Sequence, residues 1–579
     1  MADSDKSQKS GGFKDLSMEL RLLIAFILMG AVLFLTPYFI KSTPVTSTSA
    51  KAPDKGAQAT PTPAPSAVPT AAPVARTTSP AADAPPATLA SKEETYTIET
   101  DMYRVVFSNR GAVVKNWILK KYKDSQPKPQ QVDLVSAAGS AITGFPFSVT
   151  FKNQQQATDL NQALFVAKPT SDGLGIDFEY SDGKLYAKKA FHFQKNNYLA
   201  DFVSEIKEGA TPLPHRLTWR GGFGDATVFN AYTTHHAIYF DLNANKLVVN
   251  EAKAAKDGPV TFQGPVSFAG IEDTYFTAVA LPPTNTPFEI QTLDEKLTTK
   301  HSDGKEQPHV GVALGGEASN HFQLFVGPKD VDILHSVNPK LEKVVDWGFF
   351  FFLTKPLFWV LHYLNDNVLH NYGWAIVVAT CLINVLLLPL KFTNLKSMRK
   401  MQEIQPHIAA INAKYKDIPL RDPRKNQQNQ EIMELYQKHK VNPLGGCLPL
   451  LIQMPFLFAI YKVLQVSIEL RGAPWLWVSD LSQPETIPIR ILPLAMIASQ
   501  FLMQKMTPST GMDPNQQKMM QFMPLMFGFM FYSASSGLVL YWLTGNLLGI
   551  LQQVFFNRLG GTPARPGPLA KPMAKIPRK

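Results

Sequence analysis

The chain of 579 residues contains only two cysteines, Cys381 and Cys447. Two isolated cysteines provide neither a disulfide framework nor the ligand spacing of a zinc site. Both fall in apolar segments, so we interpret them as small packing residues. The sequence therefore predicts a protein without a metal or another cofactor.

Motifs for nucleotide binding, zinc proteolysis and serine hydrolysis are also missing. No G-x-x-x-x-G-K-[ST], H-E-x-x-H or G-x-S-x-G pattern occurs. His235 and His236 form an isolated pair that lacks a metal-ligand set, which favours a surface loop. The long apolar segments contain no pair of ionisable residues, which argues against a proton relay. Lys462 is the one clear charge inside them, near a predicted outer end, while Arg490 and Lys505 lie close to the two ends of another run. We therefore expect a protein that is not an enzyme.

Long apolar runs are abundant instead. Residues 22–40 carry no charge over 19 positions. As a helix they would be about 28 Å long, close to the ~30 Å hydrocarbon core of a bilayer. Further runs occur at 373–390, 446–468, 487–505, 520–533 and 537–556. These six runs predict a polytopic α-helical membrane protein with six transmembrane helices. The first run could instead be a cleaved signal peptide, but its length favours an uncleaved anchor.

Basic residues are concentrated in two segments of this chain, whose net charge is +11. Residues 391–441 contain 11 Lys and Arg against 5 Asp and Glu, and residues 557–579 contain 6 Lys and Arg and no acid. Positive charge accumulates on the cytoplasmic side of membrane proteins. We therefore expect both termini in the cytoplasm and residues 41–370, apart from their membrane contacts, outside. Membrane lipids or a ribosome could bind the basic segments, and specific nucleic-acid binding is not expected.

The region outside the membrane begins with a segment rich in Pro, Ala, Thr and Ser. Residues 41–94 lack the apolar side chains of a core and are predicted to form a disordered linker. Residues 95–335 then alternate apolar and polar positions, with a hairpin signal at Asp182-Gly183. This pattern predicts a large periplasmic antiparallel β-sandwich domain.

The other segments are assigned from the same patterns. Residues 343–370 are aromatic and interrupted by Lys355-Pro356, which favours an amphipathic interfacial helix over a seventh span. Apolar residues spaced by three or four in 391–441 predict a cytoplasmic helical hairpin. Trp475 and Trp477 are typical of an outer interface. The remaining assignments are a cytoplasmic N-terminus (1–21), a periplasmic loop (469–486), a cytoplasmic loop (506–519) and a basic cytoplasmic tail (557–579).

Uncharged polar residues occur inside the predicted spans, and a buried amide without a partner costs roughly 2–7 kcal/mol. Interhelical hydrogen bonds explain some of them. Their number favours a shared, water-containing cavity in addition. The residues are Thr380, Asn384, Gln453, Tyr461, Gln465, Gln500, Gln504, Ser535, Thr544 and Asn546.

The stretch VNPLGGCLPLLIQMPFLFAIY (441–461) resembles the signature of the YidC/Oxa/Alb family of membrane protein insertases. Similar family segments follow in the same order: ILPLAMIASQFLMQKM (491–506), DPNQQKMMQFMP (513–524) and SGLVLYWLTGNLLGILQQ (536–553). The anchor and outer β-domain resemble those of Gram-negative members. The resemblance implies an ATP-independent insertase and chaperone of the bacterial inner membrane. It would insert and fold nascent membrane proteins, including lipoproteins, alone and with the Sec translocon and its accessory subunits.

The resemblance also implies that five of the six helices enclose a hydrophilic groove. Thr380, Gln453 and Tyr461 match groove or client-contact positions, and Gln500 and Gln504 are assigned to the same groove. Asn384 stands where bacterial members typically carry an arginine, so we expect it to hydrate the groove without a fixed positive charge. The cytoplasmic residues expected to recruit clients or ribosomes are Lys396, Arg399 and Lys400.

A channel or transporter with the β-domain as a receptor is the alternative function. Inverted repeats or paired intramembrane charges would favour it. The sequence has neither, so we favour the insertase.

Overall fold

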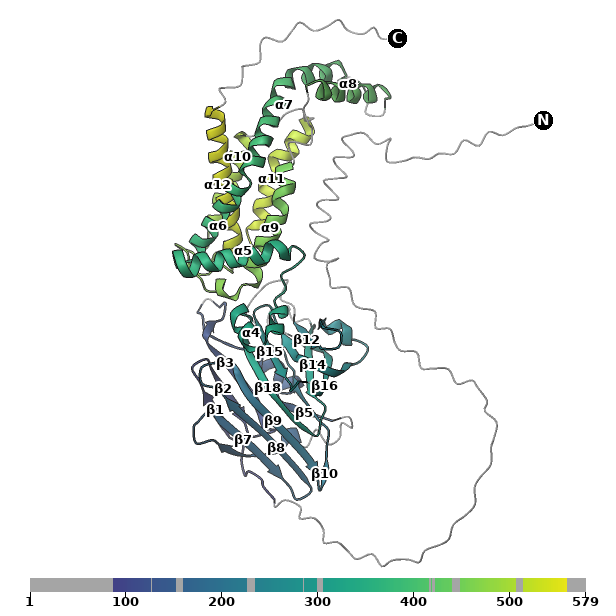
Figure 1. The fold of residues 1–579 in the computed structure, drawn as a ribbon, viewed down its shortest axis with the longest axis vertical. Coiled ribbons are helices and arrows are strands. Elements are labelled where there is room, and N and C mark those ends of the chain that lie inside the picture. Colours follow the sequence, from purple (N-terminus) through teal and green to yellow (C-terminus); the bar gives the residue numbers. More distant parts are fainter. Residues whose placement is uncertain are drawn as a thin grey trace, which may run out of the picture.

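The computed structural model describes residues 87–559 apart from 127, 152–159, 226, 228–234, 285, 299–305, 416–417, 419–421, 440–447 and 507–513. The predicted anchor at 22–40, most of the linker and most of the basic tail lie outside these residues. The described chain forms a β-domain and a helical bundle, with one helix lying across the junction between them (Figure 1).

Two antiparallel sheets build the β-domain. The smaller sheet has the order β1 (Thr95–Glu99), β2 (Tyr103–Ser108), β3 (Val113–Lys123) and β4 (Gln131–Asp133). The larger sheet has 14 strands, with the main order β5-β11-β17-β16-β14-β15-β18-β9-β8-β7-β6. Its strands are β5 (Ser148–Thr150), β6 (Val166–Pro169), β7 (Gly175–Ser181), β8 (Leu185–Phe193), β9 (Leu199–Glu208), β10 (Thr211–Pro212), β11 (Arg216–Trp219), β12 (His236–Asp241), β13 (Lys246–Asn250), β14 (Val260–Glu272), β15 (Phe276–Leu281), β16 (Pro287–Thr298), β17 (Glu306–Gly315) and β18 (Ser319–Pro328).

Aromatic side chains fill the space between the two sheets. The ring of Phe107 on β2 lies 4.8 Å from that of Phe191 on β8, and Trp117 on β3 lies 5.8 Å from Phe193. Each buried aromatic residue removes a large apolar area from water, which favours this face-to-face packing. The predicted antiparallel β-rich domain is therefore confirmed, although one of its sheets is much longer than the other.

The hairpin predicted at Asp182-Gly183 connects β7 to β8. Gly183 has a φ of 86°, which a residue with a side chain rarely adopts. The carboxylate of Asp182 accepts hydrogen bonds from the backbone N–H groups of Lys184 at 2.8 Å and Leu185 at 2.7 Å. The turn is thus held by the two residues that predicted it.

Lys189 on β8 is fully buried. Its ammonium group donates to the carbonyl oxygens of Gly111 at 2.6 Å and Phe147 at 2.7 Å, and to that of Ala112 at 3.2 Å. Burial lowers the pKa of Lys189 to about 7. This lysine connects β8 both to the turn that precedes β3 and to Phe147, the residue before β5.

Short helices connect the β-domain to the bundle. After α4 (Val331–Val337) and η3 (Pro339–Val344), helix α5 (Phe351–Leu364) lies across the base of the bundle (Figure 1). Its buried face includes Leu357 and Phe358, whereas Trp359 and Tyr363 are exposed. The assignment of 343–370 to the membrane interface stays a prediction, and a helix with one packed and one exposed face is compatible with it. A π-helical turn, Asn365–Leu369, ends it.

Seven helices form the bundle and its extension in the described chain. They are α6 (Tyr372–Leu386), α7 (Leu388–Lys414), α8 (Arg424–Lys438), α9 (Leu448–Val466), α10 (Ile491–Met506), α11 (Pro514–Phe531) and α12 (Ser536–Leu559). Among the described residues, Ser536–Arg558 is long and apolar enough to cross a membrane. The pair Tyr372–Leu386 and Leu388–Met401, bent by 55°, would be a second span. The full set of six spans stays a prediction.

The bend between α6 and α7 changes one predicted boundary. The sequence placed the end of a span at 390, but α7 starts at Leu388 and continues without a break to Lys414. Pro389 in its first turn lacks an N–H group, and a proline at this position is compatible with the start of a new helix. The α7–α8 hairpin therefore begins inside the segment assigned to the membrane.

The α7–α8 hairpin has its own apolar cluster. Met401, Ile404 and Ile408 of α7 pack with Tyr436 of α8, and Ile432 and Leu435 border them. Lys414 forms an ion pair with Glu431 at 2.7 Å. Figure 1 places α8 at the end of the bundle far from the β-domain.

The loop between α9 and α10 connects the bundle to the β-domain. Arg471 forms an ion pair with Asp225, and both side chains are almost completely buried. Its guanidinium group also donates to the carbonyl oxygen of Lys123 at 2.8 and 3.1 Å and lies over the rings of Tyr275 and Phe276.

Trp475 in the same loop does not lie at an exposed interface as the sequence suggested. It is 8% exposed and packs against Trp374 and against Gly373. A Cβ atom on Gly373 would lie 2.1 Å from the Trp475 ring, so the glycine makes room for the indole. Only Trp477, which is 44% exposed, fits the interfacial assignment.

Candidate functional site

Asn384 lies on the buried face of α6. That face consists of residues spaced by three or four, including Ala379, Thr380 and Ile383, whereas Leu382 and Val385 are exposed. Asn384 is 5% exposed. A helix of this kind presents one face to its neighbours and the other to the surroundings.

The side-chain amide of Asn384 has a partner for each polar atom. Its Nδ2 donates to the Thr380 carbonyl oxygen at 2.8 Å, and its Oδ1 accepts from Lys391 Nζ at 2.5 Å. Thr380 in turn donates its hydroxyl to the Ile376 carbonyl oxygen at 2.6 Å. The cost of burying this amide is therefore offset within α6 and the first turn of α7.

A second set of polar groups surrounds α12. The indole N–H of Trp542 donates to Gln500 Oε1 of α10 at 3.2 Å. The side chain of Tyr541, also on α12, forms a hydrogen bond with the side chain of Gln453 on α9. Gln500 was expected beside Asn384, but it bonds to α12 instead.

Two further residues extend the α12 set. Asn546 of α12 donates to Ser499 Oγ of α10 at 3.0 Å, and both residues are buried. Thr544 of α12 donates back to the Leu540 carbonyl oxygen at 2.8 Å, within its own helix. Polar side chains of α9 and α10 thus converge on one helix.

The predicted groove residues consequently form two groups. Thr380 and Asn384 lie on α6 with Lys391, whereas Gln453 and Gln500 lie beside α12. Within the described chain, no hydrogen bond connects the α6 pair to Gln453 or Gln500. Tyr461 is half-buried against the main core, and Gln504 is half-buried on α10. Lys462, next to Tyr461, forms an ion pair with Asp346 at 2.6 Å.

Two family models match the chain. The one described as "60Kd inner membrane protein" covers residues 363–562, and the "YidC periplasmic domain" model covers residues 95–360. The membrane protein insertase YidC of Pelobacter propionicus is 35% identical over 510 residues, which are 84% of this chain and 91% of the relative. This chain belongs to the YidC family of membrane protein insertases. The YidC of Geotalea daltonii is 33% identical over 570 residues, which are 93% of this chain and 99% of the relative.

A solved structure of an active YidC insertase, with its first transmembrane domain resolved, has 19% sequence identity and a TM-score of 0.35. The match covers 82% of this chain and 94% of that chain. The β-domain described above lies within the match to the family's periplasmic domain.

The three basic residues expected to recruit clients differ in their surroundings. Lys396 and Lys400 are exposed on α7. Arg399 instead donates to the Phe556 carbonyl oxygen at 2.6 Å, and its guanidinium carbon lies 4.0 Å from the centre of the Phe556 ring. Arg399 therefore binds the last turns of α12, where a cation is favourable because the carbonyl groups there point outward.

Sequence reasoning missed Lys391 as part of the site. Its position, seven residues after Asn384, is a spacing of about two helical turns, which could have indicated that the two side chains lie close together although the chain bends between them. The uncharged run ends at 390, so the lysine was assigned to the cytoplasmic segment 391–441. Trp542 and Tyr541 were missed as well, because an aromatic residue in an apolar run gives no sign that it donates a hydrogen bond.

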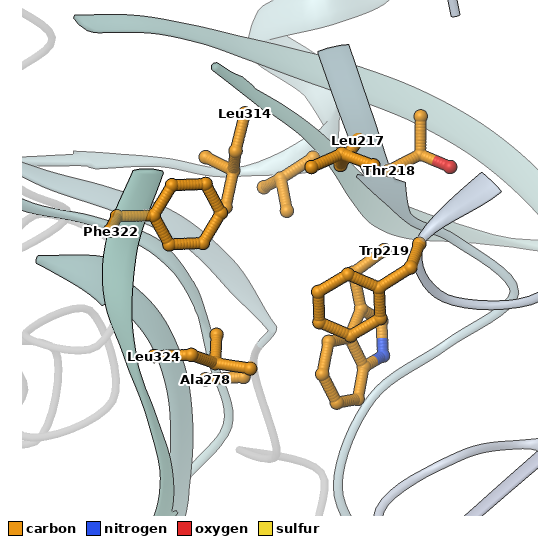
Figure 2. Close-up of a pocket in the computed structure, with 9 residues that line it drawn as sticks. Leu217, Thr218, Trp219, Ala278, Leu314, Phe322 and Leu324 are labelled. Atoms are coloured by element: carbon orange, nitrogen blue, oxygen red, sulfur yellow. The ribbon is translucent and has the colours of Figure 1, made fainter. Parts of the chain in front are cut away.

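The β-domain contains a small apolar cavity of about 20 Å³ (Figure 2). That volume is enough for about one water molecule. Phe322 and Leu324 border it on one side and Leu217 and Trp219 on another. We interpret it as a packing gap, because it is far too small for a ligand. Among the described residues, no group of three or more His, Cys, Asp or Glu could hold a metal.

Proposed function

We propose that this protein inserts membrane proteins into the bacterial inner membrane through a hydrophilic groove among α6, α9, α10 and α12. The observation that carries the proposal is the set of internal polar contacts: Asn384 with Lys391, Gln500 with Trp542, and Gln453 with Tyr541. In an apolar bundle such groups are costly unless they have partners. These groups satisfy one another in the closed bundle, and the same donors and acceptors can bind a client's polar segment when the helices separate.

The mechanism requires no covalent chemistry. When the helices separate, water and the client's polar groups take over the hydrogen bonds that these side chains now make with one another. The client's apolar segment then moves into the bilayer, because burial of its apolar surface is favourable. The exposed apolar residues of α11, including Phe529 at 88%, are suited to contact lipid or such a segment.

The membrane topology is part of the proposal. We propose six spans, with both termini and the α7–α8 hairpin in the cytoplasm and the β-domain in the periplasm. The basic segments at 391–441 and 557–579 support this orientation. The proposed partners are nascent membrane proteins, the ribosome, the Sec translocon and its accessory subunits, and membrane lipids.

Photo-crosslinking from position 384 tests the proposed groove. A crosslinker in place of Asn384 should capture a ribosome-stalled nascent membrane protein, because this face of α6 would receive the client. The control is a crosslinker in place of Val385, the next residue, which is 61% exposed on the other face of the same helix. Equal capture from both positions, or capture from Val385 alone, would contradict a groove on the Asn384 face.

Charge reversal tests the role of the hairpin. Lys396→Glu together with Lys400→Glu should weaken ribosome or client association several-fold at low salt, where contacts between exposed charges are strongest. The thermal stability of the bundle should stay unchanged, because both side chains are exposed. Arg399→Glu is a separate variant, because it also removes the contact with α12. Association that is unchanged at low salt in the double variant would refute the recruiting role.

A further inference from the structure

The hairpin between β3 and β4 lies against the helical bundle. The backbone carbonyl oxygen of Lys123, the last residue of β3, accepts hydrogen bonds from Arg471 at 2.8 and 3.1 Å. The ring of Tyr122 packs edge to face with that of Phe276, with 5.6 Å between the ring centres. One contact thus fixes the end of β3 to the loop between α9 and α10, and the other fixes it to β15.

Three exposed lysines, Lys121, Lys123 and Lys128, belong to this hairpin, and we call them the hairpin lysines. Alternate residues of a strand point to opposite faces, so Lys121 and Lys123 lie on the face opposite to Tyr122. Within the described chain, none of the three forms an ion pair. The carboxylate of Asp124 accepts a hydrogen bond at 2.8 Å from the backbone N–H group six residues further along. Three lysines against this one acid leave the hairpin with a net positive charge.

Other acids close to the hairpin are occupied or lie on its buried side. Glu99 forms an ion pair with Lys120 at 2.8 Å. Burial raises the pKa of Tyr122, and the nearby carboxylates of Asp330 and Glu469 add to this shift. These two acids therefore face the side of β3 that carries Tyr122. The side that carries the hairpin lysines remains free to bind an external anion.

The junction also carries exposed aromatic residues that are typical of a membrane surface. Trp477, in the loop that binds the hairpin, is 44% exposed, and α5 exposes Trp359 and Tyr363. Exposed Trp and Tyr residues are enriched at the level of the lipid headgroups. The β-domain is the periplasmic domain of an inner-membrane protein. The hairpin lysines consequently lie on the periplasmic side, next to the level at which headgroups are expected.

We propose that the β3–β4 hairpin binds anionic phospholipid headgroups of the periplasmic leaflet through Lys121, Lys123 and Lys128. The inference rests on the membrane topology that is part of the proposed function. Lysine ammonium groups bind phosphate oxygens as point charges, and their long stems can reach toward a nearby surface. Because Arg471 holds the hairpin to the bundle, this contact fixes the orientation of the β-domain relative to the bilayer. We favour lipid over an acidic protein because the hairpin is held beside the membrane-embedded bundle.

The experiment uses the full-length protein in nanodiscs of two compositions. One contains equal parts of phosphatidylcholine and phosphatidylglycerol, and the other contains phosphatidylcholine alone. A photo-crosslinker in place of Gln126, which is exposed in the hairpin, should capture several-fold more phospholipid in the anionic nanodiscs. A crosslinker in place of Thr211 should capture little lipid in either, because β10 lies at the end of the β-domain far from the bundle (Figure 1).

Lysine variants decide whether the charge is the cause. Lys121→Gln with Lys123→Gln should lower lipid capture from position 126 in anionic nanodiscs by about fivefold or more. High salt should have a similar effect on the wild type. The variant should fold, because both side chains are exposed and the backbone carbonyl that binds Arg471 is kept. Lys121→Arg with Lys123→Arg keeps the charge and should keep the capture.

A matched control removes two lysines from the other end of the domain. Lys184→Gln with Lys207→Gln lies beside β10 and should leave lipid capture from position 126 unchanged. Equal capture in both kinds of nanodisc, or capture that survives the hairpin glutamine variant, would overturn the proposal. In native inner-membrane vesicles, capture of a protein in place of lipid would overturn it in favour of a protein-docking surface. Client insertion without lipid capture would overturn this inference alone, whereas no insertion of any client would overturn the proposed function.

Discussion

Replacement of Arg471 by methionine should destabilise the junction between the β-domain and the helical bundle by about 3–5 kcal/mol. The variant leaves the buried carboxylate of Asp225 without its cation, and it removes the two hydrogen bonds to the Lys123 carbonyl oxygen. Methionine fills a similar volume, so the loss reflects charge and hydrogen bonding rather than a cavity. Thermal unfolding in detergent and limited proteolysis of the loop between α9 and α10 measure the effect.

A double variant provides the control for the Arg471 result. Arg471→Met combined with Asp225→Asn removes both charges, so part of the lost stability should return. If the double variant is as unstable as the single one, the ion pair is not the cause. A single variant with wild-type stability would show that the junction does not depend on Arg471.

Asn384→Leu should lower insertion of clients with polar or charged translocated segments by about tenfold and affect apolar clients less. Leucine resembles asparagine in size, so the bundle should fold, but the ammonium group of Lys391 loses its acceptor. Asn384→Arg should be harmful by itself, because it places a second cation beside Lys391. Asn384→Arg with Lys391→Gln should restore function, since one charge then remains in the same place.

Thermal stability and client insertion, measured side by side, decide between a groove residue and a structural one. If Asn384 only connects helices, both single variants should be unstable and should impair all clients equally. Full activity of Asn384→Leu with every client would contradict a role of this residue in the groove.

Part of this architecture follows from local sequence patterns. Strand alternation and the Asp182-Gly183 turn predicted an antiparallel β-domain, because both signals act over a few residues. The apolar spacing at Met401, Ile404 and Ile408 likewise predicted the buried face of α7. The resemblance of residues 441–461 to an insertase signature indicated the family that the comparisons confirm.

The polar contacts that organise the junction, the β-domain and the candidate site depend on the tertiary structure and could not be predicted. Arg471 and Asp225 are 246 residues apart, and neither stands out in its own segment. A lysine on a strand, such as Lys189, is ordinarily expected to be exposed. It is nevertheless buried among three carbonyl groups. The contact between Lys391 and Asn384 depends on how α7 starts after the bend that follows α6, which the apolar pattern does not show. Each of these polar residues is buried beside a partner that is either far away in the sequence or on the other side of a helix boundary. A local sequence pattern shows neither kind of partner.

The separate apolar cluster of the α7–α8 hairpin has a consequence for how the molecule opens. A unit with its own core can move as one body, because the apolar contacts of that core are kept when it is displaced. Among the described contacts, Arg399 with Phe556 connects the hairpin's first helix to the end of α12. Displacement of the distal hairpin therefore requires far less free energy than unfolding of the bundle. We expect α8 and the end of α7 that packs against it to change orientation while the other helices stay assembled.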